Sequence, residues 1–304
     1  MPGRKLTGAL ALGVIAAAQV GVAGAAQAPL AQLPQRGHVA DTVRLPATQA
    51  EAQQLGRDVD GDGHVDNLLG GALAAFNGQG FEPAAVQSAI DNGDIVMLHS
   101  LRTTSVADST NATWQVWYDA PTPDPDLSGS GTFELSVDRP HSKRLAATIS
   151  DHQVTTAPGA IPVRLDIGAG VFRLRLTQAV VDATCHRRGC SAGRITGAVG
   201  EEQIQKKLFR ELAELFQIVV SRDCPGPGPD SCTGTGTNVQ SLFDTNDDLV
   251  ITRAELRSNS LLQTVLSPDL DLFEADGTPG QDGINDAVSF GLGFKTARAT
   301  LVGP

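Results

Sequence analysis

The segment GVFRLRL, residues 170–176, is the clearest guide to how this chain folds. Phe172, Leu174 and Leu176 alternate with Arg173 and Arg175, so that apolar and charged side chains follow one another with a period of two. In an extended strand this period places the apolar side chains on one face and the charged ones on the other. The segment therefore predicts a half-buried strand of an antiparallel sheet.

The same alternation continues on both sides of this segment. In residues 113–118, Trp114, Val116 and Tyr118 share one face. Further candidate strands, separated by turn-forming residues, are residues 95–101, 131–137, 145–150, 161–167, 179–184 and 193–199. Together these strands predict an α+β fold based on an antiparallel β-sandwich or half-barrel.

One long amphipathic helix is expected directly after the strands, over residues 201–220. Its apolar side chains recur at spacings of three and four, which gives one stripe along the helix. The stripe consists of Ile204, Leu208, Leu212, Leu215, Phe216 and Val219. We expect this stripe to pack against the sheet.

Shorter helices are expected around the strands. The residues after the signal peptide, up to about Pro46, are polar and are expected to be mobile. The chain ends with residues 289–302, whose alternation predicts a strand that returns to the sheet. The predicted short helices are residues 47–55, 67–76, 82–90, 238–243 and 253–265.

These elements divide the chain into five parts. Residues 1–28 are expected to be a signal peptide, and residues 29–92 a helical segment with an acidic loop. Residues 93–199 form the antiparallel β region, and residues 200–286 a helical region with a second acidic loop. Residues 287–304 are the closing strand, so the second loop is an insertion within one fold.

The N-terminus predicts export. Arg4 and Lys5 precede an apolar stretch that is rich in Ala and Gly, and several small residues near Ala26 offer cleavage points. A membrane anchor is the alternative, but the apolar stretch is short, and we expect no transmembrane segment in the remaining chain. The mature protein is expected in the periplasm or outside the cell.

The overall charge limits the class of partner. The formal net charge is −11, and removal of Arg4 and Lys5 with the signal peptide gives −11 − 2 = −13. Such a surface repels nucleic acid, which excludes it as an expected partner, and attracts cations. Because 41% of the residues are apolar, the chain can build a core.

Four cysteines indicate disulfides in an exported protein. Short loops close most easily, which favours Cys185 with Cys190 and Cys224 with Cys232. A four-cysteine zinc site is the alternative, but neither spacing is the CxxC that such sites use.

The strongest chemical signal is the loop at residues 244–255. Ca²⁺ prefers six to eight oxygen ligands. Asp244, Asn246 and Asp248 stand at the first, third and fifth positions of the loop, and Glu255 at the twelfth. The main-chain carbonyl of Val250 and the hydroxyl of Thr252 complete the candidate ligand set.

This loop resembles the EF-hand family over about twenty residues. The resemblance implies a helix–loop–helix calcium site in which Ile251 contacts a partner loop. One position departs from the family pattern: Leu249 occupies the sixth position, where the family uses Gly for a left-handed turn. A side chain there costs about 1–2 kcal/mol.

A second candidate loop lies near the N-terminus. Asp58, Asp60, Asp62 and Asp66 occupy the first, third, fifth and ninth positions, with a glycine at the sixth. His64, at the seventh, contributes through its main-chain carbonyl. The pattern resembles the start of an EF-hand or a dockerin repeat, although the twelfth residue is a leucine. We therefore also predict calcium binding here.

A third acidic cluster and the wider layout of the chain carry less information about function. A third acidic cluster, between Asp269 and Asp286, follows no EF-hand register and is expected to be a solvated loop. The wider layout resembles exported proteins of Gram-negative bacteria, and this resemblance implies no particular activity.

The sequence favours a non-catalytic exported protein whose calcium ions are structural. It contains no GxSxG, HExxH or nucleotide-binding motif. Three alternatives remain open: a secreted hydrolase with structural calcium, a protein that binds an apolar ligand, and an adhesion module for a protein or sugar. An exposed Trp117 would favour the third.

Overall fold

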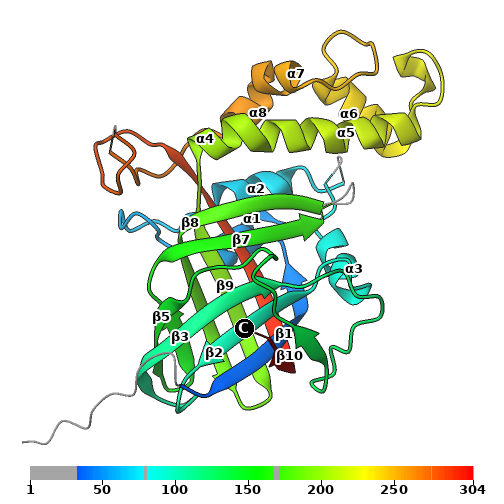
Figure 1. The fold of residues 1–304 in the computed structure, drawn as a ribbon. Coiled ribbons are helices and arrows are strands. Elements are labelled where there is room, and N and C mark those ends of the chain that lie inside the picture. The colour runs from blue at the N-terminus through cyan, green and yellow to red at the C-terminus, as the bar shows by residue number, and fades with distance from the viewer. Residues whose placement is uncertain (1–32, 79–80, 167–170, 275, 304) are drawn as a thin grey trace, which may run out of the picture.

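A computed structural model describes residues 33–78, 81–166, 171–274 and 276–303. The protein has two layers: a curved antiparallel sheet, and helices that cover one end of it (Figure 1). The predicted α+β class with a large antiparallel sheet is confirmed. The signal peptide predicted at residues 1–28 lies outside the described residues.

The sheet contains ten strands in the described part of the chain. The predicted strand at residues 145–150 matches β5, and the predicted return of the C-terminal segment to the sheet is confirmed by β10. The strands are β1 (Gln35–Arg44), β2 (Met97–Arg102), β3 (Ser109–Tyr118), β4 (Thr132–Glu134), β5 (Leu145–Ser150), β6 (Gln153–Thr156), β7 (Gly159–Asp166), β8 (Val171–His186), β9 (Gly189–Gly200) and β10 (Ala287–Val302).

The sheet closes on itself. The strands follow the order β1-β2-β3-β5-β6-β8-β9-β10, and β10 then pairs with β1, with Val39 opposite Ala297. Strand β7 pairs with one end of β8, and the short β4 lies parallel to the end of β10. The closed ring differs from the expected sandwich or half-barrel, both of which leave open edges.

The ring was not expected because β1 carries few aliphatic residues. Its sequence, QRGHVADTVR, lies in the stretch whose polar composition predicts a mobile segment. Instead it is an interior strand of the sheet, with β2 on one side and β10 on the other. Its inward side chain His38 is 2% exposed, so a polar residue takes a position that an aliphatic residue usually takes.

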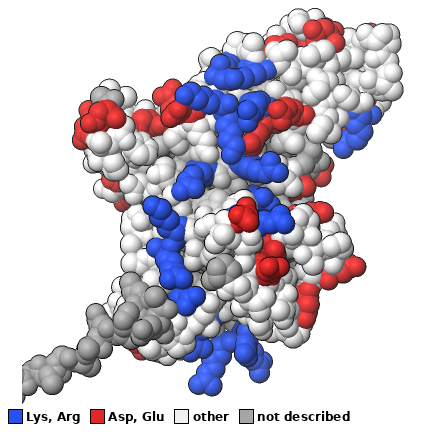
Figure 2. Space-filling model, viewed as in Figure 1, with Lys and Arg blue, Asp and Glu red and all other residues white. Residues whose placement is uncertain are grey.

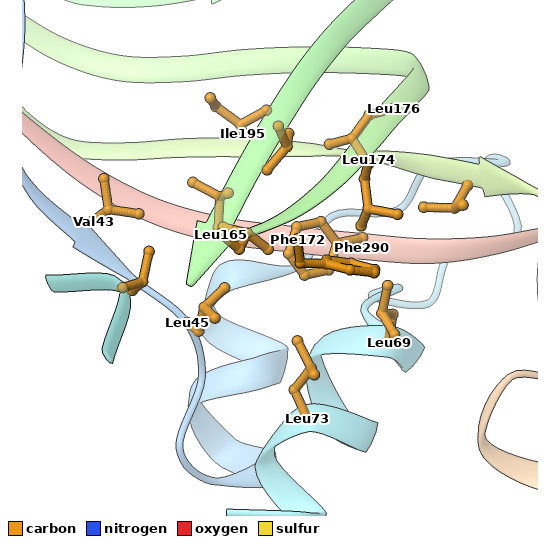
Figure 3. Packing of buried hydrophobic residues seen from close by; sticks show 14 of the residues in the cluster. Val43, Leu45, Leu69, Leu73, Leu165, Phe172, Leu174, Leu176, Ile195 and Phe290 are labelled. Carbon is orange, nitrogen blue, oxygen red and sulfur yellow. The ribbon is translucent and has the colours of Figure 1, made fainter. Parts of the chain in front are cut away.

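The alternation in residues 171–176 corresponds to the predicted half-buried strand. Phe172, Leu174 and Leu176 are buried, whereas Arg173 and Arg175 are exposed. Figure 3 shows these leucines and Phe172 near Phe290 of β10 and the helical residues Leu69 and Leu73. The main core therefore runs from inside the ring to the helical layer.

The helical layer lies over the end of the ring at β7 and β8 (Figure 1). The predicted long helix is continuous but contains a π-helical turn, Ile204–Leu208. Its apolar stripe is buried as predicted, with Phe216 stacked on Phe243 at 4.6 Å between ring centroids. The helices are α1 (Gln49–Leu55), α2 (Leu68–Ala75), α3 (Ala85–Asp91), α4 (Glu201–Gln203), α5 (Phe209–Asp223), α6 (Gly234–Phe243), α7 (Arg253–Ser258) and α8 (Ser260–Val265).

The helix predicted at residues 253–265 is broken into α7 and α8 at Asn259. The Asn259 side chain accepts a hydrogen bond from the Leu262 amide at 3.1 Å and donates one to the Leu242 carbonyl at 2.7 Å. Asparagine is favoured at helix N-caps for this reason. The predicted single helix is therefore wrong at this residue.

Both predicted disulfides are present. Cys185–Cys190 joins the two sides of the turn between β8 and β9, and Cys224–Cys232 joins the end of α5 to the segment before α6. Within the described residues, none of the helices is long and apolar enough to span a membrane.

Candidate functional site

The loop at residues 58–66 connects α1 to α2 and is fixed at both ends. Arg57 and Asp66 pair through their main chains, with N–O distances of 3.3 and 2.9 Å. The Arg57 guanidinium also lies 3.2 Å from the Asp182 carboxylate of β8. At the other end, Asn67 caps α2 and bonds to Gly291 of β10. The loop is therefore held against the closed sheet.

Three carboxylates converge in this loop. Asp58, Asp60 and Asp66 each offer an oxygen, and these oxygens lie within 4.8 Å of one another. Asp62 is not part of this group, and its carboxylate lies 3.2 Å from Nδ1 of His64. The sequence-based ligand set is thus brought together in part.

The carboxylates of this loop influence one another. Burial is the main cause that raises the pKa of Asp66 to about 6, and the charges of Asp60, Asp269 and Asp62 add to it. Burial also raises the pKa of Asp269, which is hydrogen-bonded to Ser289. A cation at this position would relieve the repulsion.

The loop at residues 244–255 connects α6 to α7. Asp244 and Glu255 are both buried, with 6% and 8% of their surface exposed. Asn246 and Asp248 lie at the exposed side and bond to each other at 3.0 Å. Val250 is half exposed, and its amide donates to Asp248 at 2.8 Å.

Both loops place left-handed residues at the same positions. In the first loop these are Gly61 and Gly63, with φ of +85° and +89°. In the second they are Asp247 and Leu249, with φ of +59° and +61°. Leu249 therefore adopts the conformation expected from the glycine of the family pattern, and carries the strain of a side chain in it.

The two loops also share their hydrogen bonds. The first carboxylate of each loop accepts from the amide at the sixth position, at 3.0 Å from Gly63 to Asp58 and at 2.8 Å from Leu249 to Asp244. Both loops thus turn their main chain around the first aspartate.

Glu255 is held by two threonines. Its Oε1 accepts from the amide and hydroxyl of Thr245, and its Oε2 from those of Thr252. Burial acts to raise the pKa of Glu255, but these hydrogen bonds outweigh it and lower the pKa. Among the described residues, the groups of three or more metal-ligating side chains within 4.8 Å do not include Asp244, Asp248 or Glu255.

The third acidic cluster stabilises its own loop. Asp271 accepts from the amides of Asp282 and Gly283, and Asp286 accepts from those of Leu272 and Phe273. These carboxylates serve as caps for turns, whereas Asp269 is half-buried and bonds to Ser289 of β10, so the cluster is only partly solvated.

Two features were not expected from the sequence. Trp117 is 5% exposed and stacks on His141 at 4.5 Å, so it is not an exposed aromatic platform. Asn67, which the sequence predicts only as the start of a helix, makes four hydrogen bonds from a buried position. An asparagine directly before an apolar helix is the signal that identifies such a cap.

Comparisons of the chain with protein-family models, with curated proteins and with solved structures give no match.

Proposed function

We propose that this chain is an exported calcium-binding protein in which the ion has a structural, non-catalytic role, and that the loop at residues 58–66 is its better-formed site. The carrying observation is the group of carboxylate oxygens from Asp58, Asp60 and Asp66 within 4.8 Å. Like charges this close repel one another, and a divalent cation converts the repulsion into attraction.

The position of the loop supports a structural role. Arg57 ties its beginning to β8, and Asn67 ties its end to β10. An ion that orders the loop therefore also stabilises the contact between α1, α2 and the sheet. Because only the folded chain holds these carboxylates together, calcium stabilises the folded state by mass action.

The loop at residues 244–255 is the second proposed site. Helices α6 and α7 flank it as in an EF-hand-type unit, and Leu249 has the left-handed conformation that this unit requires. Both Glu255 oxygens already accept hydrogen bonds from Thr245 and Thr252. Coordination must exchange some of these bonds, so we expect the second site to be the weaker one.

The two disulfides support the exported location, since such bonds persist in oxidising compartments. Calcium is plentiful outside the cytoplasm, where sites with dissociation constants of about 10⁻⁴–10⁻³ M are filled.

The space between the sheet and the helices does not support two of the alternatives, a protein that binds an apolar ligand and a secreted hydrolase. The cavity there has a volume of about 30 Å³, and its lining residues, among them Leu69, Phe172 and Leu212, are all apolar. Ligand pockets usually measure about 300–1,000 Å³. This cavity therefore supports neither an apolar-ligand site nor a hydrolytic site with titratable groups.

Thermal unfolding of the mature protein tests the proposal. At a calcium concentration about twenty times the dissociation constant, binding adds about 2 kcal/mol to the free energy of unfolding. We expect a rise in melting temperature relative to EDTA, and Asp60→Asn should remove most of it. Glu255→Gln should have the smaller effect. Asp124→Asn, an exposed aspartate in a distant turn, is the matched control and should leave the rise unchanged.

Two outcomes of this experiment would contradict the proposal in part or in full. A calcium-dependent rise that Glu255→Gln removes and Asp60→Asn does not would reverse the proposed order of the sites. No rise in the unmodified protein would show that calcium does not stabilise this fold.

A further inference from the structure

A hollow of about 870 Å³ lies at the end of the closed sheet that faces away from the helices. Strand β8 runs down to His186, turns, and returns as β9 to Gly200, where the helical layer begins. The turn between the two strands is therefore at the opposite end of the ring (Figure 1). The loop after β2, the β5–β6 turn and parts of β1 and β10 complete the wall.

The wall of this hollow is basic. Arg36, Arg187, Arg188 and Lys295 line it, against one carboxylate, Asp41. Figure 2 shows Lys and Arg side chains at the lower end of the molecule, where the β8–β9 turn lies, and in a band farther up the same face. The lining of the hollow is therefore positively charged, although the chain has a net charge of −11.

These cations have no partner of opposite charge in the described part of the chain. The ion pairs there, at N–O distances up to 4.0 Å, involve other basic residues, such as Arg57, Arg194 and Lys206. A second hollow of about 370 Å³ shares Arg36 and Arg187 and adds Arg298. Unpaired cations around a concave surface focus a positive potential that attracts anions.

The basic turn is held rigidly. The Cys185–Cys190 disulfide closes it, and the Arg188 carbonyl accepts a hydrogen bond from the Arg298 amide at 2.7 Å. The Cys190 amide donates to Thr296 at 2.9 Å. Gly189 lies so close to β10 that an added Cβ would be 1.9 Å from the Thr296 carbonyl oxygen. Arg187 and Arg188 are thus presented on a preorganised frame, which lowers the entropic cost of binding.

Two histidines extend the polar wall. The rings of His152 and His186 lie 4.4 Å apart, and Nδ1 of His152 is 3.1 Å from the Cys185 carbonyl oxygen. Imidazole and guanidinium groups together provide several N–H donors, and guanidinium binds carboxylate or phosphate in a bidentate manner.

We propose that this basic hollow binds a small organic or inorganic polyanion with two or more phosphate or carboxylate groups. Its volume falls within the range of small-molecule pockets, about 300–1,000 Å³. Arg187 and Arg188 provide the main contacts, Arg36 and Lys295 the surrounding positive charge, and Asp41 limits affinity by repulsion. The site is independent of the calcium loops.

Isothermal titration calorimetry with pyrophosphate and with citrate tests this proposal. The buffer must be freed of calcium with a chelating resin, because both probes bind calcium. We expect saturable binding of at least one probe, weakened at least about tenfold by Arg187→Gln combined with Arg188→Gln. Asp41→Asn should tighten binding, which no unfolding effect can imitate. Lys206→Gln combined with Arg210→Gln removes two exposed positive charges from the long helix and is the charge-matched control.

Binding of pyrophosphate alone assigns the site to phosphate compounds, and binding of citrate alone assigns it to carboxylates. Absence of saturable heat with both probes up to about 10 mM overturns the proposal. Equal weakening by the combined Lys206→Gln and Arg210→Gln control also overturns it, since that result indicates attraction to the overall charge.

Discussion

Gln217 of α5 is hydrogen-bonded to the main chain of Ile251 in the acidic loop at residues 244–255. Its Oε1 accepts a hydrogen bond from the Ile251 amide at 2.8 Å, and its Nε2 donates to the Leu249 carbonyl at 3.1 Å. One side-chain amide thus satisfies two main-chain groups of the acidic loop. The EF-hand resemblance implies that Ile251 contacts a second loop. In the structure, the loop at residues 244–255 is instead hydrogen-bonded to the long helix through Gln217.

Gln217→Ala should destabilise the protein. The substitution removes both hydrogen bonds and leaves the amide of Ile251, a residue with 5% exposure, without its partner. The expected loss in the free energy of unfolding is about 1–3 kcal/mol. Urea denaturation measures it. Ile218→Ala, at the next and 54% exposed position, should change stability far less; equal losses would contradict the role of the amide.

Asn67→Ala should be more severe. The Asn67 side chain accepts from the Gly70 and Gly291 amides and donates to the Ala52 and Gly291 carbonyls. Its removal leaves buried main-chain groups unpaired and uncaps α2, so we expect a loss of about 3–5 kcal/mol. Chemical denaturation provides the measurement.

The comparison for this variant is Asn238→Ala, because Asn238 is exposed on α6. That substitution should stay within about 0.5 kcal/mol of the unmodified protein. A loss at Asn67 no larger than at Asn238 would show that the link between α2 and β10 is not important for stability.

Acid should destabilise the closed ring through its two inner histidines. Burial lowers the pKa of His38 to about 4 and that of His99 to about 3. The charges of Arg36 and Arg298 are smaller causes of the same lowering of the pKa of His38 to about 4. The unfolded chain takes up protons near pH 6.5, and the folded chain does so only near the lowered values. Stability should therefore fall as pH decreases from about 6.5 towards 4.

His99→Phe tests the origin of this acid sensitivity. The His99 ring stacks on Phe294 at 4.6 Å, and neither of its nitrogens has a hydrogen-bond partner among the described residues. Phenylalanine therefore loses no hydrogen bond and removes one titrating group. Urea midpoints between pH 7.5 and 5 should fall less steeply in the variant. Asp66 acts in the opposite direction, since its pKa is raised, and an unchanged slope would assign the acid sensitivity elsewhere.

Replacing Cys224 and Cys232 together by serine should cost about 2.5 kcal/mol. The bond closes a loop with a sequence separation of 8 and so restricts the unfolded chain. Thermal unfolding under oxidising conditions measures the loss.

The variant without Cys224 and Cys232 should bind polyanions normally, whereas replacing Cys185 and Cys190 should weaken that binding. Identical effects of the two double variants on binding would argue against a rigid basic turn.

Strands with aliphatic alternation were predictable. Residues 145–150 were predicted as a strand and form β5 without a shift at either end. Strand β8 was predicted as two strands because Thr177 and Gln178 interrupt the alternation. They form a bulge, with a register shift between Thr177 and Val180 and a φ of +48° at Gln178. A β-bulge within one strand and a turn between two strands have similar sequence signals, since both interrupt the two-residue alternation of apolar and polar side chains.

The candidate sites also differ in how far they can be predicted from the sequence. The acidic loops could be found from sequence because their carboxylates lie close together along the chain. The basic hollow could not, since Arg36, Arg187 and Lys295 belong to three different strands or turns. Pairing of β10 with β9 brings Lys295 close to the turn that carries Arg187. Arg36 joins them only because β1 closes the ring, and the polar sequence of β1 does not predict a strand.

Closure of the ring also sets an order for folding. Val39 pairs with Ala297, and these residues are 297 − 39 = 258 positions apart in the chain. Such non-local pairing is slow to form, because a long loop must be closed before the contact stabilises it. Until β10 joins, β1 and β9 both present unpaired edges, which are prone to associate with other chains. Strand β10, which follows the other nine strands of the sheet along the chain, therefore completes the sheet and removes the surfaces most liable to aggregation.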